Sequence, residues 1–151
     1  MIRITTESFN LEEEFNKITN STNGAYSFFL GTVRSDIEKN QKINGIFLEC
    51  YEKLAYQQLS QIQSKAIKYW KLNGCVIIHR VGNLLVGEKI VLVLTSSNHR
   101  SDAIKSCEFI IDYLKIDAAF WKFNITGNEQ IAIQAKEKDQ KKFLMWKDVI
   151  I

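Results

Sequence analysis

Proline is absent from this chain of 151 residues, and only three cysteines and two histidines occur. The cysteines, Cys50, Cys75 and Cys107, are widely spaced and contain no C-x-x-C pair, so neither a zinc motif nor a disulfide framework is present. Their apolar sequence neighbours predict buried thiols in a reducing compartment. Without proline, turns must be located from glycine, asparagine, serine and charged runs.

Long apolar runs are also missing. No segment approaches the ~20 apolar residues that a membrane-spanning helix needs, and residues 1–10 lack the apolar centre of a signal peptide. Twenty Lys and Arg against seventeen Asp and Glu leave a formal charge of +3. This is far short of the dense basic stripe of a non-specific nucleic-acid binder. We therefore expect a cytoplasmic protein whose charge is compatible with a small anionic ligand.

What is present predicts one α+β domain over residues 1–151. The chain is 46% hydrophobic, and at this length a fold can bury roughly 70% of its unfolded surface without disulfides or a metal. Alternating or continuous apolar runs predict strands, and apolar residues at helical spacing predict helices. The expected strands are 2–5, 24–33, 46–52, 75–81, 89–95, 119–125 and 129–134, and the expected helices are 11–18, 54–72, 101–115 and 139–146.

The element order favours a mixed or antiparallel sheet with helices on one face and a β-hairpin subdomain. Strands 24–33 and 46–52 are expected to pair as a hairpin with a long, mobile polar tip. Strands 75–81 and 89–95, joined by a turn at 82–87, are almost wholly apolar and are expected at the centre of the sheet. The face opposite the long helices would then be free for a second copy of the chain.

The candidate site residues are cationic. No Walker loop, G-x-G-x-x-G, G-x-S-x-G or H-E-x-x-H motif occurs, so neither a metal nor a resident cofactor is expected. His99 and Arg100 come directly before a predicted helix, whose free N–H groups and positive dipole end favour an anion. Lys115 closes the same helix. Each of these residues also has an ordinary explanation. His99 and Arg100 would be solvated loop residues, and Lys115 would be a last-turn cation that complements the helix dipole.

Lys122 lies inside the apolar segment 119–123, and two interpretations stay open. It is either at an exposed edge or in a pocket that lowers its pKa and makes the amine reactive. The aromatic neighbours suggest a strand that stacks RNA bases, but alternation leaves only Phe120 on the face of Lys122. His79, within an apolar strand, is interpreted as a core residue.

Six segments, taken in order, resemble one family, the large catalytic subunit of molybdopterin synthase (MoaE-like proteins). Their order and spacing over about residues 24–122 make the resemblance specific. The segments are Gly31-Thr32-Val33-Arg34, Leu48-Glu49-Cys50-Tyr51, Ile78-His79-Arg80-Val81-Gly82, Gly87-Glu88, Thr95-Ser96-Ser97-Asn98-His99-Arg100, and Phe109-Ile110-Ile111-Asp112-Tyr113-Leu114-Lys115 continuing to Phe120-Trp121-Lys122.

The resemblance implies a hammerhead-like α+β fold and an enzyme that inserts two sulfur atoms into cyclic pyranopterin monophosphate (precursor Z), which forms the dithiolene of molybdopterin. The implied sulfur donor is the C-terminal thiocarboxylate of a small ubiquitin-like subunit. Two large subunits form the central dimer of the implied heterotetramer. The alternative function is a non-catalytic α+β module that binds an anionic ligand or RNA on the same cationic face.

The resemblance also assigns site residues. Lys115 and Lys122 match the two active-site lysines of the family, and Arg34, His99 and Arg100 match residues of the pocket that holds the pterin phosphate. A cyclic phosphate and a thiocarboxylate tail both need positive charge in a confined site. The cations that stand out in the sequence are therefore those that the resemblance assigns to the site.

Two positions depart from the family. Ala119 stands where the family usually has proline before Phe-Trp-Lys, which leaves the backbone that enters the strand less restrained. Lys136 stands where relatives often have an arginine facing the pocket, and a lysine cannot bind phosphate in bidentate fashion. Lys136 is retained as a candidate substrate-binding residue.

Overall fold

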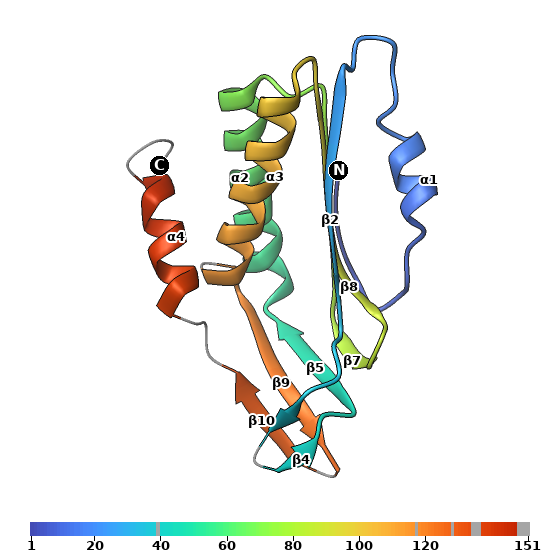
Figure 1. The fold of residues 1–151 in the computed structure, drawn as a ribbon, viewed down its shortest axis with the longest axis vertical. Helices are drawn as coiled ribbons and strands as arrows, with labels where there is room; N and C mark the ends of the chain where they lie inside the picture. Colours follow the sequence, from blue (N-terminus) through green and yellow to red (C-terminus); the bar gives the residue numbers. More distant parts are fainter. Residues whose placement is uncertain (39, 117, 128, 134–136, 148–151) are drawn as a thin grey trace.

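Two four-stranded sheets carry the fold (Figure 1). The computed structural model of the chain describes residues 1–38, 40–116, 118–127, 129–133 and 137–147. The first sheet, here called the scaffold sheet, has the strand order β1-β6-β8-β2 and consists of β1 (Ile2–Thr5), β6 (Gly74–Arg80), β8 (Lys89–Ser97) and β2 (Ala25–Thr32). The second, the site sheet, has the order β10-β9-β5-β7 and consists of β10 (Glu129–Ile133), β9 (Phe120–Thr126), β5 (Gly45–Cys50) and β7 (Gly82–Leu85).

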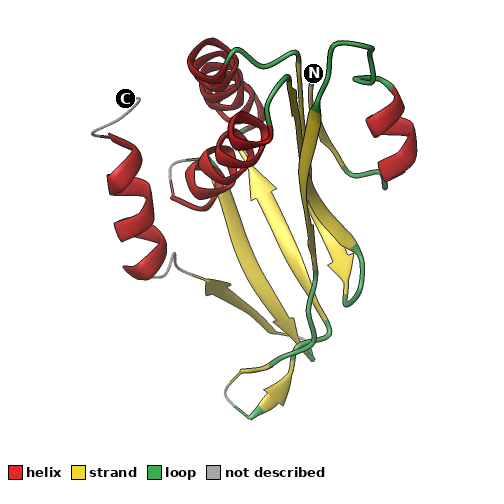
Figure 2. Ribbon diagram, turned by 45° about the horizontal axis from the view of Figure 1, so that its top comes forward, coloured by secondary structure: helices red, strands yellow, loops and turns green. Residues whose placement is uncertain are grey.

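Helices cover both faces of the scaffold sheet (Figure 2). The helices are α2 (Glu52–Trp70) and α3 (Arg100–Ile116) on one face, α1 (Leu11–Asn16) on the other, and α4 (Glu137–Lys147), which packs against α3. Because side chains alternate along a strand, β6 and β8 contribute to two cores. The core beneath α2 and α3 includes Leu59, Ile62, Cys75, Ile77, Val93, Phe109 and Ile110, and the core beneath α1 includes Phe9, Val76, Ile78, Leu92 and Leu94. Within the described residues, no helix has the length and apolar character needed to span a membrane.

The predicted α+β class is confirmed, and so is the central position of β6 and β8. β6 pairs with β1 in parallel and with β8 in antiparallel orientation, so the scaffold sheet is mixed. The predicted start of α1 is also confirmed, because Asn10 Oδ1 accepts hydrogen bonds from the backbone N–H groups of Glu12 (2.9 Å) and Glu13 (3.3 Å). Local sequence patterns therefore located the elements of this sheet correctly.

The predicted hairpin between β2 and β5 is wrong. β2 pairs with β8 from Ala25 to Thr32, whereas β5 pairs with β7 and β9 in the site sheet. In its actual place β2 lies between two helices: α3 contacts it, and Tyr26 packs against Phe15 of α1 with ring centroids 4.8 Å apart. These contacts with two helices come from segments far away in the sequence, and a local sequence pattern does not report them.

Two segments that were expected to be irregular contain strands. The polar tip after β2 holds a short ribbon, β3 (Ile37–Glu38) with β4 (Gln41–Lys42). The expected turn at 82–87 contains β7, and it begins and ends at glycines with left-handed backbones, Gly82 (φ 85°) and Gly87 (φ 90°). The chain therefore passes from the scaffold sheet into the site sheet and back through these two glycines.

The central part of the sheet face that was expected to be free for a second copy is covered, whereas Phe28 of β2 on the same face is exposed. Val76, Ile78, Leu92 and Leu94 are all fully buried in the core beneath α1. The interpretation considered only the two long helices, whereas one short helix is enough to cover this part of the sheet. A second copy of the chain cannot bind to these side chains.

All three cysteines are free thiols. Cys75 and Cys107 are buried, as predicted, whereas Cys50 is half-buried. Burial raises the pKa of Cys75 to about 12 and that of Cys107 to about 11. Both thiols are therefore protonated and unreactive at neutral pH.

Candidate active site

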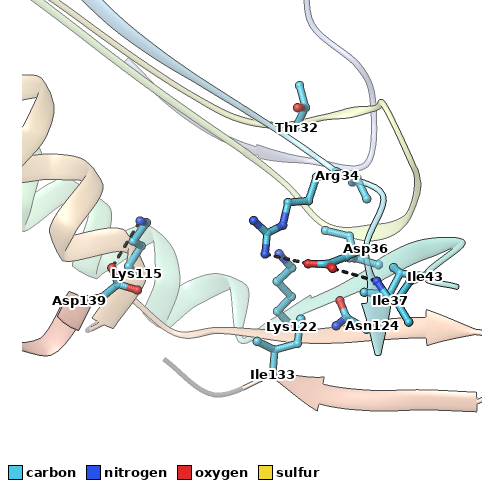
Figure 3. Close-up of a pocket in the computed structure, with 12 residues that line it drawn as sticks. Thr32, Arg34, Asp36, Ile37, Ile43, Lys115, Lys122, Asn124, Ile133 and Asp139 are labelled. Carbon is cyan, nitrogen blue, oxygen red and sulfur yellow. Dashed lines mark hydrogen bonds and ion pairs between the residues drawn. The ribbon is translucent and has the colours of Figure 1, made fainter. Parts of the chain in front are cut away.

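A cavity of about 490 Å³ lies where the end of β2, the site sheet, α3 and α4 meet (Figure 3). Its volume is within the range of ordinary small-molecule sites. Its lining combines polar and charged side chains with aliphatic ones. The lining residues are Thr32, Val33, Arg34, Asp36, Ile37, Ile43, Ile46, Lys115, Lys122, Asn124, Ile133 and Asp139.

Three predicted site residues, Arg34, Lys115 and Lys122, converge on this cavity from three different elements. Arg34 follows the end of β2, Lys115 lies in the last turn of α3, and Lys122 is on β9. Figure 3 shows the side chains of Arg34 and Lys122 pointing toward one another, with Lys115 on the opposite wall. Segments that are far apart in the sequence therefore place three cations around one space.

The position of Lys122 decides between its two interpretations. β9 is an interior strand of the site sheet, where Lys122 lies between Leu48 of β5 and Ile133 of β10. Its side chain is half-buried and lines the cavity, and alternation brings Asn124 to the same face. Lys122 is thus in a pocket, not at an exposed edge.

Two carboxylates face the three cations. Arg34 forms an ion pair with Asp36 (2.9 Å), and Lys115 Nζ lies 3.6 Å from Asp139 Oδ1. The described lining therefore keeps one positive charge in excess. Such a cavity attracts an anion of the phosphate or carboxylate class, and the Asn124 amide adds a neutral hydrogen-bond donor.

His79 is buried on β6, close to Lys122, which confirms the interpretation of His79 as a core residue. Its ring stacks on Phe120 with centroids 3.8 Å apart, and Nδ1 donates a hydrogen bond to the Arg80 carbonyl oxygen at 2.8 Å. Burial lowers the pKa of His79 to about 4, the bond to Arg80 opposes this shift, and the charge of Lys122 adds to it. His79 is therefore neutral at pH 7 and adds no positive charge behind the site.

His99 and Arg100 do not join this cavity within one copy of the chain. Arg100 begins α3 and Lys115 lies near its end, which corresponds to a separation of about 22 Å at the helical rise per residue. His99 instead lines a separate hollow of about 410 Å³, together with Tyr69 and Asp102. One small ligand cannot contact both ends of α3 in the same copy.

One candidate residue cannot be placed in the structure, and several residues of the cavity were not predicted from the sequence. Lys136 lies outside the described residues. Asp36, Asn124 and Asp139 line the cavity but were not predicted from the sequence. Asn124 carried a usable signal, because it is two residues after Lys122 on the same strand, whereas nothing local in the sequence places Asp139 beside Lys115.

The backbone at Ala119 is more restrained than its sequence suggested. The Ala119 N–H donates a hydrogen bond of 2.8 Å to Gln58 Oε1 on α2. Proline has no N–H and could not make this bond. The entry to β9 is therefore held by a side chain from α2, at the position where the resemblance led us to expect a proline.

No metal site is found among the residues that the structure describes. They contain no group of three or more His, Cys, Asp or Glu side chains placed to hold a metal ion. The polar groups that the described cavity offers are amines, a guanidinium, carboxylates, an amide and the Thr32 hydroxyl.

Comparison with known proteins gives consistent matches. A sequence model of the family described as MoaE protein matches residues 4–117. A molybdopterin synthase catalytic subunit from Haemophilus ducreyi is 38% identical over 124 residues, which are 82% of this chain and 82% of that protein. The structure of a molybdopterin biosynthesis MoaE protein from Burkholderia ambifaria is 37% identical, has a TM-score of 0.79 and matches over 97% of both chains. A structure of the complex of subunits 1 and 2 of molybdopterin-converting factor from Helicobacter pylori contains a chain that is 26% identical, with a TM-score of 0.74 and a coverage of 91% of both chains.

Proposed function

Because this chain belongs to the MoaE protein family, we propose that the cavity beside its site sheet is where molybdopterin is made. The chain is an enzyme of molybdenum cofactor biosynthesis, and its reaction is a sulfur transfer. We locate the site in this cavity because Arg34, Lys115 and Lys122 all line it and because its size suits a small molecule.

The proposed substrate is cyclic pyranopterin monophosphate, and the proposed sulfur donor is the C-terminal thiocarboxylate of a small ubiquitin-like subunit. The two-subunit complex from Helicobacter pylori supports a partner of this kind. In each of two transfers, a carbon–sulfur bond replaces a carbon–oxygen bond of the pterin side chain, and the displaced oxygen leaves as water or stays on the phosphate as the cyclic ester opens. Water then cleaves the acyl–sulfur bond, so that the tail leaves as a carboxylate. Since both reactants are anions, the cations of the cavity reduce their mutual repulsion.

The roles that we propose follow from the position of each cation. Lys115 stabilises the oxyanion that forms at the thiocarboxylate carbon, or activates the thiocarboxylate for attack. Lys122, half-buried on an interior strand, transfers a proton or holds the tail and the half-sulfurated intermediate. Arg34 presents a planar guanidinium, which suits bidentate contact with the substrate phosphate.

His99 and Arg100 bind the same substrate in this proposal only if a second copy of the chain supplies them. Their separation of about 22 Å from Lys115 excludes a contribution from the same copy. A homodimer that brings the start of α3 from one copy to the cavity of the other satisfies this requirement, and two small subunits would complete a heterotetramer. Lys136 stays a predicted substrate-binding residue.

The alternative of a non-catalytic module that binds an anion or RNA is not favoured. Its RNA version needs an aromatic ring beside Lys122 for base stacking. Phe120, which shares that face, is already stacked on the buried ring of His79. The curated relatives are catalytic subunits as well.

The test is a single-turnover reaction with the thiocarboxylated small subunit and cyclic pyranopterin monophosphate, in which dithiolene formation is followed by mass spectrometry. The wild-type chain should form product, and Lys115→Ala should form none. Lys105→Ala removes an exposed lysine from the same helix, and we expect it to behave as wild type. Full sulfur transfer by Lys115→Ala would refute the role of Lys115. A folded wild type that binds the small subunit but forms no product would refute the proposed function.

A further inference from the structure

Among the side chains of helix α4 that the structure describes, one charged group lines the cavity, that of Asp139, and it forms an ion pair with a proposed catalytic lysine. Asp139 Oδ1 lies 3.6 Å from Lys115 Nζ, and both residues line the cavity (Figure 3). The Asp139 side chain is 16% exposed, whereas that of Lys115 is 50% exposed. The half-exposed lysine therefore faces a carboxylate on a shorter and better buried side chain.

The packing of α4 explains why Asp139 has this position. Phe143 and Trp146 follow it by four and seven residues, so the three side chains lie on one face of the helix. Phe143 is buried and packs against Tyr113 of α3 with ring centroids 5.8 Å apart. Trp146 Nε1 donates a hydrogen bond of 3.0 Å to Asp112 Oδ2. These contacts fix the rotation of α4 and direct Asp139 toward the last turn of α3.

An ordinary explanation of Asp139 also exists. It lies in the first turn of α4, where the helix dipole favours a negative charge. A second ion pair between the same two helices, Lys142 with Glu108 at 3.2 Å, lies on the exposed surface, and neither of its residues lines the cavity. If Asp139 served only to dock α4, then removal of either ion pair would have a similar effect.

We propose that Asp139 is a positioning residue for Lys115 in sulfur transfer, which rests on the function proposed above. The ion pair restricts the rotamers of Lys115 before the substrate binds, so less side-chain entropy is lost when the ammonium meets the developing oxyanion. The carboxylate also offsets one of the three positive charges of the cavity and so weakens the binding of anions. Asp139 therefore speeds the reaction of the bound complex while it weakens the formation of that complex.

The test measures kcat, and KM for cyclic pyranopterin monophosphate, with the complete enzyme and its thiocarboxylated small subunit. Asp139→Asn removes the charge at nearly constant size. It should lower kcat about tenfold and also lower KM about two- to fivefold. Asp139→Glu restores the charge and should recover most of kcat. Lys142→Gln removes the matched exposed ion pair and should leave both constants unchanged.

Each other outcome overturns the proposal in a recognisable way. An unchanged kcat in Asp139→Asn, beside an active wild type, excludes positioning but leaves the proposed function intact. Equal losses in Asp139→Asn and Lys142→Gln, or a fall in kcat with a rise in KM, indicate that α4 docking is the cause. If circular dichroism shows that Asp139→Asn is unfolded, then Asp139→Ser is measured in its place. If the wild-type enzyme forms no product, the proposed function is refuted, and this inference, which rests on it, is refuted as well.

Discussion

The central strands β6 and β8 of the scaffold sheet are buried more completely than strand β9 of the site sheet. In the scaffold sheet, β6 and β8 contribute apolar side chains to a core on each face, and most of these side chains are fully buried. In the site sheet, β9 is largely half-buried, and one of its faces lines the cavity with Lys122 and Asn124. Stability and chemistry are therefore expected to separate between the two sheets, because charged groups can stay accessible only where burial is incomplete.

The largest expected effect tests the scaffold sheet alone. Ile77 is fully buried at the centre of β6, so Ile77→Ala should lower the free energy of unfolding by about 2–5 kcal/mol. Ile104→Ala, on the exposed side of α3, should change it by less than about 0.5 kcal/mol. Urea denaturation measures both values. Equal effects from the two variants would contradict the buried packing of β6.

Lys122→Met tests the site sheet, where we expect a substitution to reduce activity and to leave stability nearly unchanged. It keeps most of the side-chain stem but removes the charge, so sulfur transfer should fall about 10²–10³-fold while the free energy of unfolding stays nearly constant. Lys68→Met, on the exposed side of α2, is the matched control and should retain activity. Single-turnover rates measure the loss of sulfur transfer, and urea denaturation measures the free energy of unfolding of the same variants. A large loss of stability in Lys122→Met would instead make Lys122 a structural residue.

His79 lies at the junction of the two sheets and should make stability depend on pH. The burial of His79 lowers its pKa to about 4, against 6.5 for the unperturbed side chain. Between these values the unfolded chain binds a proton that the folded protein does not, so acidification destabilises the fold. The loss approaches about 3 kcal/mol at pH 4. Urea denaturation at pH 7 and pH 5 should show this dependence in the wild type and a weaker one in His79→Gln.

The smallest expected effect concerns the second junction, between α2 and β9. Gln58→Ala leaves the Ala119 N–H without its side-chain acceptor and should lower the free energy of unfolding by about 1 kcal/mol. Gln58→Glu retains an acceptor at this position and should lower it less. Thermal unfolding of the two variants gives the comparison. If both match the wild type, Gln58 does not restrain the entry to the site sheet.

The central strands of the scaffold sheet were predicted from the sequence better than strands β5 and β7 of the site sheet. Continuous apolar runs made β6 and β8 recognisable as central strands, because full burial leaves a strong local signal. β7 gave no such signal and was expected to be part of a turn, and β5 was assigned to the wrong partner. Sheet pairing is decided by non-local burial, and short, half-buried strands carry little of that information in their own sequence.

The site was only partly predictable for the same reason. Resemblance identified Arg34, Lys115 and Lys122, and the fold brings them together. The counter-charge Asp139 depends on how α4 docks, which no local pattern describes. His99 and Arg100 were assigned correctly to the start of a helix, but in one copy they lie far from the cavity, and their action in the cavity of a second copy stays a proposal. The cytoplasmic location stays a prediction.

The most direct measurement mixes two variants that we expect to be inactive by themselves, Lys115→Ala and Arg100→Ala. If one site combines the cavity of one copy with the start of α3 from another, then dimers that contain one chain of each variant have one intact site. After exchange of chains in the presence of the small subunit, sulfur transfer should recover to about a quarter of the wild-type rate. If the mixture is no more active than either variant alone, although mass spectrometry shows mixed dimers, then His99 and Arg100 do not act in the cavity of a second copy.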